Sequence, residues 1–103
     1  MRTMLRVTMD VIASNKAIKD GTLSEIINST MDRVHPESSY FTTIDGCRAC
    51  IMVFELHDPS EIPSIAEPFF VSLNAKVEFS PVMNADDLKR GLEMTAKSFA
   101  MAL

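Results

Sequence analysis

The feature that most constrains the fold is an apolar pattern that occurs twice in the chain, 39 positions apart. Each occurrence has six positions spaced by three and four residues, and this spacing places all six on one face of a helix. The chain is therefore expected to consist of two halves with similar elements. The two sets are Leu23, Ile26, Ile27, Thr30, Met31 and Val34, and Ile62, Ile65, Ala66, Phe69, Phe70 and Leu73.

Local signals delimit the first of these helices. Thr22 and Glu25 form a capping-box pattern, in which the hydroxyl and the carboxylate each satisfy a free backbone N–H. The helix is expected to stop near residues 33–34, because His35 precedes a proline and is pushed out of the α region.

The segment before this helix combines a strand with a short helical turn. Residues 3–12 alternate between two faces, which is typical of a half-buried strand and places Asp10 within it. Ser14 or Asn15 then caps a helical turn that Gly21 interrupts.

Three more segments have strand character. Residues 39–44 are rich in aromatic and β-branched side chains, and the following Asp45-Gly46 pair is typical of a two-residue hairpin. The strand over 47–56 is apolar on both faces at its centre, which indicates cover on both sides. Residues 75–80 alternate again, and Pro81 indicates a strand end or an edge strand.

Two further helices are expected. The second striped helix opens at Asp58, and Pro63 and Pro68 predict that it is kinked or broken, because each removes an N–H donor. Residues 84–87 cap a final helix, with acidic side chains suited to its N-terminus. Its apolar stripe consists of Leu88, Leu92, Ala96, Phe99 and Leu103.

The element order is β-α-β-β-α-β plus a C-terminal helix, the split βαβ arrangement. Over residues 3–82 the chain resembles the ferredoxin-like fold, an α+β antiparallel sheet, and the dimeric α/β-barrel superfamily. A single domain over 1–103 is expected. The chain is also similar to small bacterial members of unassigned activity, through residues 15–21 and 62–70. This resemblance transfers no functional residue to the chain.

One face of such a sheet carries the helices and the other is bare. Ile51 and Val53 are expected on the bare face, where they need a cover from a second subunit or from the C-terminal helix. We expect a homodimer in which two sheets face each other. The bare-face residues expected from the alternation are Arg6, Thr8, Asp10, Ala49, Ile51, Val53, Glu55, Lys76 and Glu78.

Composition excludes several classes of protein. The 103 residues include 10 basic and 14 acidic side chains, which argues against a nucleic-acid partner, because such proteins need a basic face. No apolar run approaches the roughly 18 residues of a membrane span, so no membrane association is expected. Arg6 and Asp10 interrupt any signal peptide near the N-terminus, and the cytoplasm is therefore the expected location.

The bare face is the candidate site, because an apolar cleft with a few convergent polar groups is typical of small-molecule binding. Asp10 or Glu55 can act as a general base if desolvation raises its pKa, and Arg6 or Lys76 can hold an anion. Alternatively, these charges pair across adjacent strands or lie at a wet interface. The candidate ligand-binding residues are Arg6, Thr8, Lys76, Glu78 and, at the rim, Tyr40.

The remaining reactive side chains are weaker candidates. His57 shares the strand parity of Glu55 and is a candidate for proton transfer, or a loop histidine without a role. Tyr40 closes the cleft or is a wet edge-strand tyrosine. Cys47 and Cys50 have C-x-x-C spacing, but in a strand they point to opposite faces and lie too far apart for a disulfide. We expect no metal and no cofactor.

Three functions remain open from the sequence. The first is a dimeric module that binds a small molecule or a partner between its sheets. The second is a cofactor-free enzyme, resembling the small monooxygenases and isomerases of the superfamily, which act on aromatic or lactone substrates. The third is an assembly protein whose interface leaves no cavity.

Overall fold

The computed structural model describes residues 1–102, and for residues 101 and 102 it describes the backbone alone. Strands and helices follow the expected order, and the turn before Gly21 is a complete helix of 10 residues. The elements are β1 (Arg2–Thr8), α1 (Val11–Asp20), α2 (Thr22–Val34), β2 (Ser38–Ile44), β3 (Cys47–Glu55), a 3₁₀ turn (Pro59–Glu61), α3 (Ile62–Leu73), β4 (Lys76–Pro81) and α4 (Ala85–Ala102).

The four strands form one open sheet in the order β2-β3-β1-β4, and every neighbouring pair is antiparallel. β1 and β2 therefore run in the same direction with β3 between them, and β3 and β4 do so with β1 between them. Each pair, with its connecting helices, is a split βαβ unit. The domain is α+β and is compatible with a ferredoxin-like fold.

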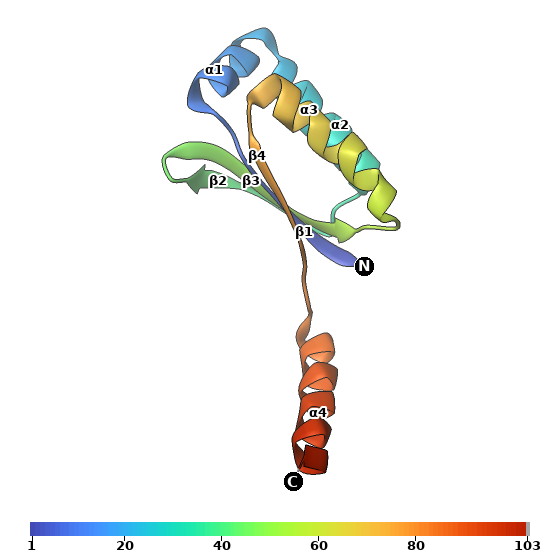
Figure 1. Cartoon of the computed structure of the whole chain (residues 1–103). Coiled ribbons are helices and arrows are strands. Elements are labelled where there is room, and N and C mark those ends of the chain that lie inside the picture. The colour runs from blue at the N-terminus through green and yellow to red at the C-terminus, as the bar shows by residue number, and fades with distance from the viewer. Residues whose placement is uncertain (103) are drawn as a thin grey trace.

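The core lies between the sheet and helices α1, α2 and α3, which cover one of its faces (Figure 1). Leu5 on β1 lies opposite Met52 on β3 and Phe79 on β4, so the expected alternation holds across three strands. Phe69 and Leu73 of α3 are fully buried against this face. The apolar stripes of the helices and the apolar side chains on one face of the strands therefore form a single layer.

Asp10 does not belong to the first strand, and this part of the sequence-based prediction is wrong. β1 ends at Thr8, and Asp10 is the N-cap of α1, where its Oδ2 accepts a hydrogen bond of 2.9 Å from the backbone N–H of Ala13. Neither Ser14 nor Asn15 caps the helix. The carboxylate of Asp10 is the cap because the free N–H groups and the dipole at a helix N-terminus favour an anion.

The start of α2 also differs from the expectation. The capping box of Thr22 and Glu25 does not form. Instead, the Thr22 backbone N–H donates to Oδ1 of Asp20 over 2.9 Å. Hydrogen bonding by the Thr22 side chain, and secondly by this backbone N–H, holds the pKa of the Asp20 carboxyl below its usual value. Gly21 separates the two helices with φ of 83°, a left-handed conformation that glycine adopts without strain.

The hairpin agrees with the sequence, whereas the proline-rich helix is not broken. Asp45 and Gly46 both have positive φ, 53° and 75°, as a type I′ turn requires. Asp58 caps a 3₁₀ turn that precedes α3, and α3 itself is continuous from Ile62 to Leu73, so the two prolines do not break it. Pro63 lies in the first turn of α3, while Pro68 lies inside it.

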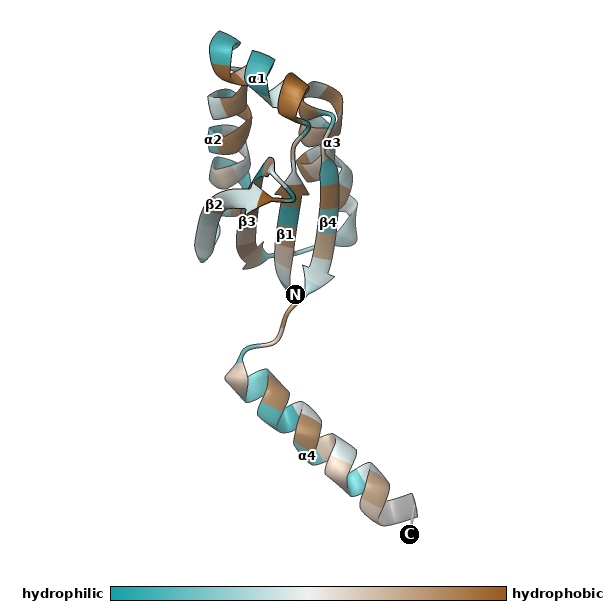
Figure 2. Cartoon of the chain, turned by 90° about the vertical axis from the view of Figure 1, so that its left-hand side faces the viewer, coloured by the Kyte–Doolittle hydropathy of each residue, from teal (hydrophilic) through white to brown (hydrophobic). Residues whose placement is uncertain are grey.

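Helix α4 points away from the rest of the domain (Figures 1 and 2). The molecule measures 62 × 28 × 20 Å, and its radius of gyration is 17.3 Å, whereas a compact chain of this length has about 13 Å. α4 therefore does not cover its own sheet, one of the two covers expected from the sequence. Leu103, the last residue of its expected stripe, lies outside the described residues.

Candidate functional site

The open face of the sheet carries the residues that the alternation predicts. Arg6 lies between Ile51 on β3 and Glu78 on β4, and the next row places Thr8 beside Lys76. These residues are half-buried or exposed, in contrast to the buried opposite face. The predicted mixture of aliphatic and charged side chains is therefore present on one surface.

A cavity of about 400 Å³ lies at one end of this face, where the end of β1, the β2–β3 hairpin and the α3–β4 connection meet. It brings together Arg6, Thr8, Asp10, Lys76 and Glu78, all of which are candidates from the sequence. Its volume falls in the range of small-molecule sites. The other lining residues are Met9, Asp45, Cys47 and Asn74.

Sequence reasoning missed Asp45 and Asn74 as cavity residues, although it had signals for both. Asp45 is part of the hairpin turn, and Asn74 is the left-handed C-cap of α3, with φ of 45°. Asparagine directly after the last residue of a helical stripe is a stop signal. These local turn signals do not show that the two turns lie at the same end of the sheet.

Arg6 is the chemically most informative residue of the cavity. Its Nε atom is buried and, within the described part of the chain, has no hydrogen-bond partner. Oε1 of Glu78 lies 3.8 Å away, in the ion pair across adjacent strands that is the alternative expected from the sequence, but this distance is too long for a hydrogen bond. A buried donor without an acceptor costs about 1–3 kcal/mol. An acceptor brought by a ligand removes this cost.

Neither Asp10 nor Glu55 is placed to act as the general base that the sequence predicts. Asp10 is engaged as the cap of α1. Glu55 lies at the opposite end of the sheet and pairs with the α-amino group of Met1. This hydrogen bond holds the pKa of the Glu55 carboxyl below its usual value, whereas a desolvated general base needs a raised pKa.

His57 lies in a different cavity, of about 320 Å³, between the end of β3 and helices α2 and α3. His35 and Glu55 line the same cavity. The 22-residue separation of the two histidines provides no local signal that connects them. Arg33 and Glu61 also line this space. Tyr40 lies on the open face in the same row as Arg6, but its side chain is 66% exposed.

The two cysteines are free thiols, as expected. Cys47 pairs with Ile44 and Cys50 with Phe41 in the hairpin register, so the two lie on opposite faces. Burial raises the pKa of the Cys50 thiol to about 11, which keeps it protonated and unreactive at neutral pH. Cys47 is half-buried and lines the 400 Å³ cavity.

Searches for related proteins and for general site types add no assignment. No protein-family model matches the chain, and no curated protein sequence matches it. Within residues 1–102, no cluster of three or more His, Cys, Asp or Glu side chains has a geometry suited to a metal ion. Over the same range, none of the helices has both the length and the hydropathy needed to cross a bilayer.

Proposed function

We propose that this protein is a ferredoxin-like, homodimeric binding module that holds a small amino or hydroxy carboxylic acid on the open face of its sheet. The cavity at Arg6 is the binding site. The split βαβ topology supports the fold. The aliphatic residues Ile51 and Val53, which α4 leaves without a cover, support the dimer.

The observation that carries this function is the buried Nε of Arg6, which has no hydrogen-bond partner among the described residues and only a long ion pair of 3.8 Å with Glu78. A guanidinium presents its donors in a planar fork that matches a carboxylate. Lys76 adds a second cation to the same cavity. A carboxylate at this position satisfies the free donor and gains a charge-assisted hydrogen bond.

The acidic residues that line the cavity restrict the charge of the ligand that fits it. Glu78 and Asp45 line it together with the two cations, so a ligand with only negative charge meets repulsion as well as attraction. A small molecule that carries an amine or a hydroxyl beside its carboxylate complements both signs. This is why we propose amino or hydroxy acids rather than simple anions.

Binding is favoured over catalysis because none of the residues expected to move protons is available for that role in the cavity at Arg6. Asp10 is engaged at the N-terminus of α1. Glu55 pairs with the chain terminus at the other end of the sheet, where it lines the separate 320 Å³ cavity together with His57. A proton-transfer role requires these groups within hydrogen-bond reach of one substrate.

Three compounds with the same carbon count test the proposed specificity: alanine, propionate and propylamine. Each is titrated into isotope-labelled protein, and backbone amide shifts of Arg6, Thr8 and Lys76 are followed by NMR. We expect saturable shifts with alanine, weaker ones with propionate and none with propylamine. Arg6→Met is expected to weaken alanine binding at least tenfold, whereas Lys19→Met, on the exposed side of α1, leaves it unchanged. Equal binding by wild type and Arg6→Met contradicts the site.

A further inference from the structure

Helix α4 carries an apolar stripe that nothing in the single chain covers. Leu92 is 59% exposed and Phe99 is 69% exposed. Leu88 lies one turn before Leu92, on the same side of the helix. Figure 2 shows hydrophobic, brown bands recurring along α4, which stands clear of the rest of the domain. Large apolar patches on a small protein mark an interaction surface.

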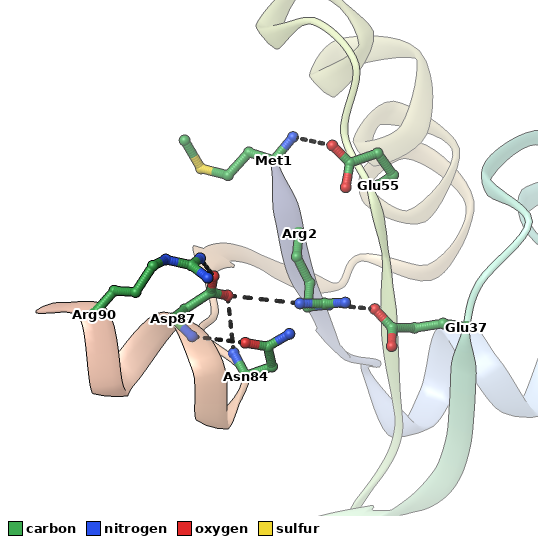
Figure 3. Close-up of polar contacts among 7 residues, drawn as sticks. All are labelled: Met1, Arg2, Glu37, Glu55, Asn84, Asp87 and Arg90. Carbon is green, nitrogen blue, oxygen red and sulfur yellow. Dashed lines mark hydrogen bonds and ion pairs between the residues drawn. The ribbon is translucent and has the colours of Figure 1, made fainter.

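Polar contacts close the first turn of α4 and connect it to β1 (Figure 3). The Asp87 N–H donates to Oδ1 of Asn84 over 2.8 Å, and the Asn84 N–H donates to Oδ2 of Asp87 over 3.1 Å. This reciprocal pair closes the N-terminus of the helix. Arg2 of β1 lies 3.7 Å from Oδ2 of Asp87 and also donates to Glu37 over 2.6 Å. The start of α4 is therefore tied to β1, close to the end of β4.

The short connection between β4 and α4 directs the stripe away from its own sheet. Only residues 82–84 separate β4 from α4, and the Val82 N–H is bonded to the carbonyl of Arg2 over 3.1 Å. To reach its own open face, the helix has to double back over the end of the sheet, which breaks the contact between Arg2 and Asp87. The apolar stripe and the open face are thus two uncovered surfaces of the same chain.

The two surfaces match in size. With 18 residues, α4 is about 27 Å long, and the nine residues of β3 extend over about 30 Å. Met4, Ile51 and Val53 are adjacent on the open face, in register across β1 and β3. Tyr40 adds an aromatic side chain beside Ile51.

We infer, on the basis of the dimer proposed above, that α4 of each copy lies along the open sheet face of the other. The stripe of Leu88, Leu92 and Phe99 packs on Met4, Ile51 and Val53 of the second copy, and the exchange is reciprocal. A helix about 27 Å long and 10 Å wide has a footprint of roughly 270 Å². Two helices and two sheet faces bury on the order of 1,100 Å², close to the lower bound for a specific interface.

This arrangement has a consequence for the proposed ligand site. The partner's α4 lies beside Arg6, which is in the same row as Ile51, and so forms one wall of the cavity. Ligand binding and association of the two copies are then linked. The site of each copy is complete only when the helix of the second copy is in place.

A pair of substitutions on α4 tests the inference in the full chain. Leu92→Glu places a charge in the stripe, whereas Met94→Glu makes the same kind of change about 200° around the helix, at a side chain that is 69% exposed. We expect wild type and Met94→Glu to have twice the 11.4 kDa chain mass by light scattering at 100 µM, and Leu92→Glu to have the single-chain mass. Circular dichroism verifies that all three are folded.

A spin label locates the helix directly. A nitroxide is attached at Thr95→Cys in a Cys47→Ser background, and this protein is mixed with isotope-labelled wild type. We expect the strongest broadening at the amides of Met4 and Ile51. A dimer that survives Leu92→Glu, or one without broadening on the open face, overturns the exchange but leaves the dimer and its facing-sheet alternative intact. A single-chain mass for wild type overturns both.

Discussion

At the scale of the residue, the structure gives Asp10 a role that differs from the expected one and leaves Arg6 within its expected roles. The sequence makes Asp10 a candidate base, yet its carboxylate accepts a hydrogen bond from the free backbone N–H of Ala13 at the start of α1. Arg6 was expected either to bind an anion or to pair across the strands. It pairs with Glu78 across the strands at 3.8 Å, and because this distance is too long for a hydrogen bond, its Nε donor remains available.

Substitutions at Asp10 separate the capping role from a catalytic one. Asp10→Ala removes the acceptor for the Ala13 N–H, and we expect a loss of about 1 kcal/mol in the free energy of unfolding. Asp10→Asn keeps an acceptor and is expected to stay within about 0.5 kcal/mol of wild type. Urea denaturation measures both.

Asp32→Ala is the matched control, because Asp32 is an exposed carboxylate on α2 away from a helix start. We expect it to have little effect on stability. If Asp10→Ala and Asp32→Ala cost the same, the hydrogen bond at the start of α1 contributes no stability.

At the scale of the element, the helix α3 shows how one residue type can have two effects. Pro63 lies in the first turn, where a backbone N–H has no intrahelical acceptor and its loss costs nothing. Pro68 lies inside the helix, where it removes a hydrogen bond to the preceding turn. The sequence located both prolines, but only the observed start of the helix at Ile62 separates the two effects.

Replacing each proline by alanine tests this difference. Pro68→Ala restores an interior N–H, and we expect it to stabilise the protein by about 1–2 kcal/mol, after allowing for the greater entropy of the unfolded chain. Pro63→Ala gains no hydrogen bond and is expected to be neutral or slightly destabilising. Thermal unfolding compares the two, and equal shifts in the midpoint contradict the account.

At the scale of the whole molecule, the single chain has a compact body and an extended arm. The body buries its apolar residues between the sheet and three helices, while α4 and the open face leave theirs accessible to water. A domain of about 100 residues has only a modest core. Covering both surfaces by a second copy adds apolar burial that one chain does not achieve.

When a second copy covers these two surfaces, the stability of the folded chain depends on the protein concentration. Because association favours the folded state, we expect the thermal midpoint to rise by several degrees between 2 and 200 µM chain. Leu92→Glu is expected to lose this dependence, and Met94→Glu is expected to keep it. A wild-type midpoint that is independent of concentration contradicts a dimer coupled to folding.

The sequence by itself determined the order of the strands and helices, the two halves and the two faces of the sheet, because these follow from local periodicity and turn chemistry. It also placed Arg6, Thr8, Lys76 and Glu78 on one surface, since strand parity is a local property. Only the tertiary structure decided that Asp10 is a cap, that His35 and His57 share a cavity and that α4 leaves the domain. These outcomes depend on which groups lie closest to one another in the folded chain. The spacing of residues along the sequence does not determine those distances.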